Sequence, residues 1–319
     1  MSAPDLNAPG PRARIAFFGL PLAAVLLAGD GHEIVYAAAC RRALGLRRLS
    51  NRIARGRTHV RPTVTSAATL ELVRAARPDL IVSWYWTTRL PETLLRIAPS
   101  VGIHPSLLPR HRGPDPCFWA IASGDAVTGV TAHRLGADYD TGDVLARREL
   151  RIEPSWDGWR LARALDRPSL ALLRDVVRAH AEGRPPLPTV QDEAAATSAP
   201  EPTHEELAIR WSQPAARIER LVRAAAPWPG AWTEIGDRLV TLVRVRVTAD
   251  FPRALERAEA AVRDDGVAVV RAGDGGGGDG GGGNGVELLE GRGEDDGPLG
   301  PHELAAIVRA SRGAANGER

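Results

Sequence analysis

One histidine and one aspartate mark the two ends of the most distinctive stretch of this sequence, residues 101–143. His104 lies in a loop punctuated by prolines, and Asp140 begins a DTG turn. An imidazole changes charge near neutral pH, and a neighbouring carboxylate favours its protonated form. Two apolar segments separate these residues and could fold the ends of the stretch back together. We therefore expect His104 and Asp140 to form a proton-transfer pair.

The segments that must position this pair read as strands of an α/β domain. Short apolar runs bounded by Gly, Pro or Asp are typical of buried parallel strands, and helical patterns lie between them. These runs cover residues 14–19, 33–38, 79–84 and 101–104, and alternating strands are expected at 128–135 and 144–152. Two helices should follow, at 156–165 and 169–181. The opening βαβ unit lacks the G-x-G-x-x-G fingerprint, so dinucleotide binding is not indicated.

Composition shifts divide the chain into five parts. Residues 1–13 form a Pro-rich tail that we expect to be disordered, 14–184 form the α/β domain, and 185–204 form a linker rich in Pro, Ala, Ser and Thr. Residues 205–300 carry short strand patterns typical of a small β-barrel. They also contain a Gly-rich run, residues 273–285, which we interpret as a flexible hairpin insertion. Residues 301–319 predict a closing helix and tail.

The overall composition is that of an ordinary globular protein. The 319 residues carry 41 basic and 39 acidic side chains, a net charge of +2, and every basic residue is arginine. Arginine titrates so high that a small excess raises the pI, which makes this balance weak support for nucleic-acid binding. Cys40 and Cys117 fit no metal or redox spacing. No apolar run has membrane-span length, so we expect a cytoplasmic, metal-free monomer that does not bind membranes.

Two further segments have both a possible functional role and an ordinary structural explanation. The basic stretch 41–61, which includes Arg47, Arg48 and Arg52, could contact phosphates or could be a solvated, arginine-rich helix. Residues 84–86 place Trp86 and two other aromatics after a buried strand, where open α/β sheets bind ligands. They could form a wall for a flat ligand or pack under the next helix.

Long motifs in their usual order give the chain a specific resemblance. The loop HPSLLPRHRG over residues 104–113, the run GDAVTGVT over 124–131 and the DTGD of 140–143 are similar to signatures of the folate-dependent formyltransferases. The segment RAAAPWPGAW over 223–232 is similar to a hallmark of the second domain in enzymes of the methionyl-tRNA formyltransferase type. The resemblance covers residues 14–290. It implies a mostly parallel Rossmann-like sheet followed by a small OB-like β-barrel.

The resemblance also implies a reaction and its residues. The donor would be 10-formyltetrahydrofolate, the acceptor an amine, and no metal would take part. His104 would handle the oxyanion and proton transfer, while Asp140 would hold the imidazole protonated and relay the proton. The folate would contact the segment Ser106, Leu107, Leu108 and Pro109, and the turn of residues 137–139, with Asp138 and Tyr139, would line the pterin slot beside Trp86.

The sequence departs from the family at one catalytic position. The family has an asparagine two residues before the histidine, and Gly102 stands there in this chain. Loss of one oxyanion-hole donor typically lowers turnover by about two to three orders of magnitude. A backbone N–H, a water molecule or His133 could substitute. His133 is either a second active-site imidazole that contacts substrate or a half-buried strand residue.

The basic stretch 41–61 also differs from the family, because it lacks the Gly- and Lys-rich sequence of the family's tRNA-contacting insertion. The acceptor could therefore be initiator Met-tRNA or a small amine, such as an amino sugar nucleotide or a hydroxyornithine-type compound. A non-catalytic folate-binding protein is a competing interpretation, since the asparagine is missing. A third interpretation is a basic RNA-binding module without catalytic activity, although such a module would not need the DTG turn.

Overall fold

The computed structural model describes residues 11–39, 45–136, 138–273 and 285–317. Cys40, the start of the basic stretch, residue 137 and almost all of the Gly-rich insertion lie outside these ranges. The chain forms two compact units. Unit 1 comprises Met1–Pro116, Val127–Arg151 and Arg163–Pro200, and unit 2 comprises Cys117–Ala126, Ile152–Ala162 and Glu201–Arg319.

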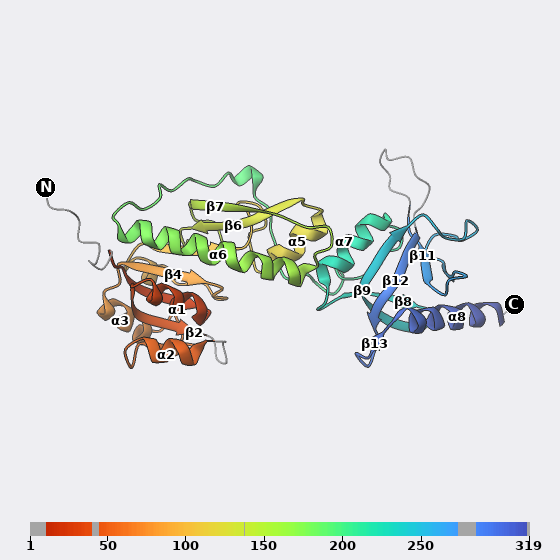
Figure 1. Ribbon diagram of the computed structural model, residues 1–319, viewed down its shortest axis with the longest axis horizontal. Helices are drawn as coiled ribbons and strands as arrows, with labels where there is room; N and C mark the ends of the chain where they lie inside the picture. The colour runs from red at the N-terminus through yellow and green to blue at the C-terminus, as the bar shows by residue number, and fades with distance from the viewer. Residues whose placement is uncertain (1–10, 40–44, 137, 274–284, 318–319) are drawn as a thin grey trace. The chain divides into compact units, whose positions relative to one another are not determined.

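Unit 1 contains a seven-stranded sheet in the order β3-β2-β1-β4-β5-β6-β7 (Figure 1). The first five strands in this order, β3-β2-β1-β4-β5, are parallel to one another. Strand β6 runs antiparallel to both β5 and β7. The expected mostly parallel, Rossmann-like sheet is therefore confirmed. The strands are β1 (Arg14–Gly19), β2 (Glu33–Ala39), β3 (Thr58–Val60), β4 (Leu80–Trp84), β5 (Ser100–His104), β6 (Val127–His133) and β7 (Val144–Arg151).

Helices and apolar side chains bury the parallel part of this sheet. Phe17, Phe18 and Ile81 are fully buried, as expected for strands that are covered on both faces. Helix α3 (Ala67–Ala76) begins after Ser66, whose hydroxyl caps it by accepting a hydrogen bond from the Thr69 N–H at 3.2 Å. The helices that begin in unit 1 are α1 (Pro21–Gly29), α2 (Leu46–Arg52), α3 (Ala67–Ala76), α4 (Glu92–Leu95) and α5 (Pro116–Ser123).

The two helices expected between residues 156 and 181 form a single helix, α6 (Gly158–Ala181), so that prediction was wrong. Pro168 lies inside α6. A proline removes one backbone donor from a helix, but the amphipathic pattern continues on both sides and keeps the helix together. Ser169 also ties this point to the sheet, because its hydroxyl accepts a hydrogen bond from the Trp84 indole at 3.1 Å and donates one to the Asp166 carbonyl at 2.9 Å.

Unit 2 contains an antiparallel sheet in the order β10-β11-β12-β9-β8, with β13 paired to β12. The small OB-like β-barrel domain expected from the sequence is confirmed as an antiparallel half-barrel sheet, and its core includes Leu242, Val269 and Leu288. Helix α7 packs on β9, and helix α8 packs on β10, β11 and β12. The elements are α7 (Ala215–Ala225), β8 (Ala231–Ile235), β9 (Arg238–Thr248), β10 (Ala260–Val262), β11 (Ala268–Arg271), β12 (Gly285–Arg292), β13 (Pro298–Leu299) and α8 (Pro301–Gly317).

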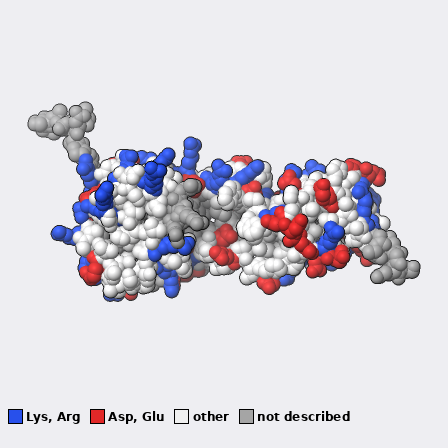
Figure 2. Space-filling model, turned by 90° about the horizontal axis from the view of Figure 1, so that it is seen from below, with Lys and Arg blue, Asp and Glu red and all other residues white. Residues whose placement is uncertain are grey.

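The charges on the surface are mixed. On the face shown in Figure 2, arginine side chains are interspersed with acidic and uncharged ones and do not merge into one continuous basic patch. Within the described residues, no helix is both long enough and apolar enough to cross a membrane. In the same residues, no group of three or more His, Cys, Asp or Glu side chains is arranged to hold a metal ion.

Candidate active site

His104 is the last residue of β5, which pairs with β4 in parallel. His104 therefore lies at the carboxyl ends of the parallel strands, where open α/β folds bind their ligands. The residue is only 5% exposed, and its Nε2 lies 2.7 Å from the carbonyl oxygen of His111. A carbonyl can only accept, so Nε2 carries a proton and donates it. The other ring nitrogen, Nδ1, is left for a different partner.

That partner is Asp140, which lies between β6 and β7. Its Oδ2 is 3.3 Å from Nδ1 of His104, so the structure brings together the two residues singled out from the sequence. The backbone of Asp140 is held in the left-handed region, with φ of 57°. Its Oδ2 also accepts a hydrogen bond from the backbone N–H of Gly113 at 3.0 Å. The carboxylate is therefore oriented by the folded chain before any ligand arrives.

His133 joins the same carboxylate from the other side. Its Nε2 lies 3.5 Å from Oδ1 of Asp140, and its Nδ1 donates to the carbonyl of Arg134 at 2.8 Å. Burial lowers the pKa of His133 to about 4, an effect that the nearby carboxylate of Asp140 only partly opposes. At neutral pH the ring is therefore uncharged and presents a lone pair on Nε2. His104, Asp140 and His133 together are called the His–Asp–His cluster below.

Gly102 faces His133 directly, because the two residues are paired in the β5–β6 ladder. A Cβ atom at residue 102 would lie 2.5 Å from Cδ2 of Leu135 and 3.1 Å from Nε2 of His133. Contacts below about 3 Å require the neighbours to move. The space that a side chain at position 102 would need is therefore already filled by an imidazole and a leucine.

The residues that hold the Asp140 loop are not marked by any motif in the sequence. The amide of Gln191 donates to the carbonyl oxygens of Asp140 and Gly142, both at 2.7 Å. The guanidinium of Arg112 in turn donates to the Gln191 side-chain oxygen at 2.9 Å and pairs with Glu193. Gln191 is 5% exposed in a segment that reads as a polar linker, and no motif surrounds it.

The loop after His104 contains the four residues expected to contact folate, Ser106, Leu107, Leu108 and Pro109. Its backbone is anchored to β6 through Thr131, whose hydroxyl donates to the Ser106 carbonyl at 2.7 Å and accepts from the Leu108 N–H at 3.1 Å. The Ser106 hydroxyl donates to the Arg110 carbonyl at 2.6 Å. Because Thr131 and Ser106 are fully buried, this loop is fixed by the sheet and does not depend on a ligand for its order.

Of the expected pterin-lining residues, Trp86 is half-buried, whereas Asp138 and Tyr139 lie at the surface. Trp86 packs on the core of unit 1, edge-on to Phe18 with ring centroids 5.8 Å apart, and its buried indole N–H has no hydrogen-bond partner in the described structure. Asp138 and Tyr139 are exposed instead. Arg89 pairs with Asp138 at 2.9 Å, and its guanidinium lies 5.7 Å from the centre of the Tyr139 ring.

Arg47, Arg48 and Arg52 lie on α2, where all three are exposed to solvent. Helix α2 contacts α1. Among the described residues, no hydrogen bond or ion pair links these arginines to the His–Asp–His cluster. The structure therefore leaves them as a separate basic surface.

Comparison with known proteins supplies a consistent set of relatives. The family model "Formyl transferase" matches residues 50–177, and "Formyl transferase, C-terminal domain" matches residues 202–276. The methionyl-tRNA formyltransferase of Anaeromyxobacter sp. (strain K) is 35% identical over 281 residues, which cover 82% of this chain and 86% of the relative. That of Roseiflexus sp. (strain RS-1) is 38% identical over 190 residues, covering 59% of this chain and 58% of the relative.

One solved structure extends the fold comparison to almost the whole chain. HypX from Aquifex aeolicus in complex with tetrahydrofolic acid has a TM-score of 0.60 and is 20% identical, covering 92% of this chain and 46% of that one. At this identity the likeness concerns the fold.

Proposed function

The chain belongs to the formyl transferase family, and on that premise we propose that it transfers a formyl group from 10-formyltetrahydrofolate to a primary amine. The observation that carries the proposal is the convergence of His104 and Asp140, with Nδ1 and Oδ2 at 3.3 Å, at the ligand-binding edge of the sheet. The folate complex of the HypX fold relative supports the choice of donor.

The reaction needs one proton to leave the amine and one to reach the folate. The amine nitrogen attacks the formyl carbon, and the carbonyl oxygen becomes an oxyanion. The bond from that carbon to N10 of the folate then breaks. The amine loses a proton, N10 gains one, and the products are a formamide and tetrahydrofolate. A site for this reaction must therefore donate to an oxyanion and move a proton over a short distance.

His104 can meet the first requirement. Its Nε2–H already donates to a carbonyl oxygen, that of His111, at 2.7 Å. We propose that the formyl oxygen of the donor takes over this hydrogen bond, because a catalytic donor commonly finds its productive partner only when substrate binds. Asp140 on the opposite ring nitrogen would stabilise the imidazolium that forms.

His133 adds a buried, uncharged imidazole to the cluster. Because its Nδ1–H is bound to the Arg134 carbonyl, the neutral ring presents an acceptor on Nε2, 3.5 Å from Oδ1 of Asp140. In that state it cannot donate to an oxyanion as the family's asparagine does. We therefore propose that His133 stays neutral, packs beside Asp140 and meets the substrate only through that carboxylate. A backbone N–H or a water molecule then supplies the missing oxyanion donor.

The acceptor we favour is initiator Met-tRNA. The relatives that cover most of the chain are named methionyl-tRNA formyltransferases, and the second domain of that enzyme type is present. The exposed arginines of α2 offer cations for a phosphate backbone. A small amine remains the alternative, because the α2 stretch is rich in arginine where that enzyme type has a Gly- and Lys-rich insertion.

The test is release of tetrahydrofolate from 10-formyltetrahydrofolate in the presence of a panel of amines. The panel contains initiator Met-tRNA, an amino sugar nucleotide and a hydroxyornithine-type amine. Turnover with Met-tRNA supports the favoured acceptor, and turnover with a small amine alone replaces it. Folate binding without turnover on any member would support the non-catalytic interpretation and contradict the proposal.

The α2 arginines have a test of their own. Replacing Arg47, Arg48 and Arg52 with Gln should weaken tRNA binding and lower the slope of log affinity against log salt concentration by about 1 for each lost phosphate contact. Arg151→Gln changes an exposed arginine at the end of β7 and serves as the control. An unchanged slope in the triple variant would remove α2 from the tRNA-binding surface.

A further inference from the structure

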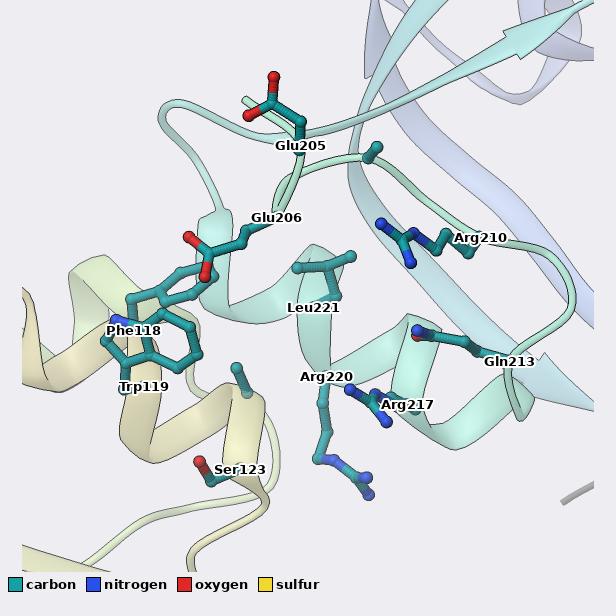
Figure 3. Close-up of a pocket in the computed structure, with 12 residues that line it drawn as sticks. Phe118, Trp119, Ser123, Glu205, Glu206, Arg210, Gln213, Arg217, Arg220 and Leu221 are labelled. Atoms are coloured by element: carbon teal, nitrogen blue, oxygen red, sulfur yellow. The ribbon is translucent and has the colours of Figure 1, made fainter. Parts of the chain in front are cut away.

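A pocket of about 520 Å³ lies within unit 2, between helix α5, the segment before α7, and α7 itself. This volume is in the range of small-molecule sites. Figure 3 shows Arg210, Gln213 and Arg217 extending into the same space from one side, while the side chains of α5 approach it from the other. We call it the arginine pocket. Its lining includes three arginines and two carboxylates beside the aromatic rings of α5: Arg210, Arg217, Arg220, Glu205 and Glu206.

The guanidinium groups of this pocket lack acidic partners. Within the described part of the chain, Arg210, Arg217 and Arg220 form no ion pair, and the buried Nε of Arg220 has no hydrogen-bond partner. Arg223, on the same helix but outside the pocket, differs: it pairs with Glu219 at 2.8 Å and donates to the Trp156 carbonyl at 2.9 Å. Arginines left unpaired around a cavity are suited to bind an anion, above all phosphate, which matches the guanidinium fork.

The opposite side of the pocket is aromatic and acidic. Trp119 is half-buried, and Phe118 beneath it is 4% exposed, with the ring centroids 5.2 Å apart in an edge-on arrangement. This contact fixes the indole as a flat surface. In Figure 3 the carboxylate of Glu206 lies beside these rings and away from Arg210 and Arg217. A carboxylate there repels phosphate but can accept hydrogen bonds from an exocyclic amine.

We infer that the arginine pocket binds a nucleoside phosphate, with the phosphate on the arginines and an amino-bearing base against Trp119 and Glu206. Stacking of bases on aromatic rings and phosphate on arginine are the usual contacts of single-stranded nucleotides. The inference rests on the proposed function, because it assigns the pocket to the nucleotide part of the amine acceptor. Both the 3′ end of a tRNA and an amino sugar nucleotide contain such a group.

The test is calorimetric titration of the full chain with AMP, adenosine and inorganic phosphate. AMP should bind at least about tenfold more tightly than either fragment, because each end of the pocket adds its own contact. Arg217→Glu should weaken AMP binding by at least about tenfold, and Trp119→Leu by about five- to a hundredfold. Arg309→Glu, which changes an exposed arginine on α8, should leave AMP binding unchanged.

Competition against AMP identifies the source of the nucleotide. A short single-stranded RNA that ends in adenosine should displace AMP if tRNA is the acceptor, and a nucleoside diphosphate sugar should displace it better if a sugar nucleotide is. Equal binding of phosphate and AMP, or an Arg217→Glu variant that binds AMP normally, would overturn the inference. Formyl transfer is measured separately: turnover without AMP binding contradicts the pocket alone, and AMP binding without turnover contradicts the proposed reaction alone.

Discussion

The His–Asp–His cluster and the arginine pocket satisfy their polar groups in opposite ways. In the cluster, both imidazoles are almost fully buried, and each ring nitrogen lies within 3.5 Å of an oxygen atom of the chain. In the pocket, the described arginines face open space without an acidic partner. Buried polar groups must find partners inside the protein, whereas exposed cations keep theirs in solvent until a ligand arrives.

This difference suggests separate roles for the two regions. The cluster is held in position for catalysis, and the pocket is open for ligand binding. The cluster is preorganised by Gly113, Gln191 and Thr131, which hold the loops that carry Asp140 and follow His104. The pocket has no such internal network among its arginines. Variants of the cluster should therefore change both turnover and folding stability, while variants of the pocket should change binding alone.

The largest expected effect comes from the cluster itself. His104→Gln keeps a side chain of similar size but removes the imidazole proton, and should lower kcat for formyl transfer by about 10²- to 10⁴-fold. Donor binding should remain. His180→Gln, which changes a half-buried histidine of α6 that contacts the Asp79 carbonyl, is the control. A His104→Gln variant with wild-type kcat would show that the cluster is structural, like any other buried polar group.

The pH dependence of folding tests whether His133 is buried without charge. Its folded pKa of about 4 lies below the ordinary value of 6.5, so the unfolded chain binds the proton more readily. The contribution of His133 to stability is complete above pH 6.5 and is lost as pH falls toward 4, by on the order of 3 kcal/mol. Denaturant unfolding of wild type and His133→Gln across this range measures it. Parallel curves would show that His133 does not titrate in this way.

The next prediction concerns the space around Gly102, which neighbouring side chains already fill. Asparagine at this position must displace Leu135 and press on His133, since a Cβ would lie 2.5 Å and 3.1 Å from them. The terminal methyl of Leu135 can rotate away, so the cost comes mainly from the contact with buried His133 and is about 1 kcal/mol. Gly102→Asn should therefore lower stability and fail to raise kcat, while Gly102→Asn combined with His133→Ala should recover part of the stability. A faster single variant would mean that the missing asparagine still has room.

Removing Gln191 tests the internal support of the cluster. Gln191→Leu leaves the carbonyls of Asp140 and Gly142 without their buried donor, which should cost about 1–3 kcal/mol in the free energy of unfolding. Turnover should fall as well, because the Asp140 loop loses its anchor. Thermal unfolding and kcat are the measurements. A loss of turnover without any loss of stability would point to direct contact between Gln191 and substrate.

The smallest effect is expected in the pocket. Arg217→Ala removes an exposed guanidinium that forms no ion pair in the described structure, so stability should change by no more than about 0.5 kcal/mol. The same thermal unfolding assay measures this change beside Gln191→Leu. A loss as large as that of Gln191→Leu would show that the arginine is held by the fold, and the contrast between the two regions would disappear.

The fold was largely predictable from the sequence, because apolar runs and motifs are local signals. Four of the five strands of the parallel sheet and the positions of His104 and Asp140 follow from such patterns. Strand β3 was missed, because it is only three residues long and lies at the end of the basic stretch. The continuous helix α6 was missed, because a proline normally ends a helix and only the contacts of Ser169 show that this one continues. Gln191 and the opposition of Gly102 to His133 depend on strand pairing and chain packing, which no spacing in the sequence reveals.

The most direct measurement follows the formyl carbon itself. The chain is incubated with 10-formyltetrahydrofolate labelled with ¹³C in the formyl group and with the best amine from the panel, and carbon NMR records where the label goes. We predict that wild-type protein moves the label to a new formamide on the amine, and that His104→Gln and Asp140→Asn leave it on the folate. Label that stays on the folate with wild-type protein, or that moves equally fast with either variant, would contradict formyl transfer by the His–Asp–His cluster.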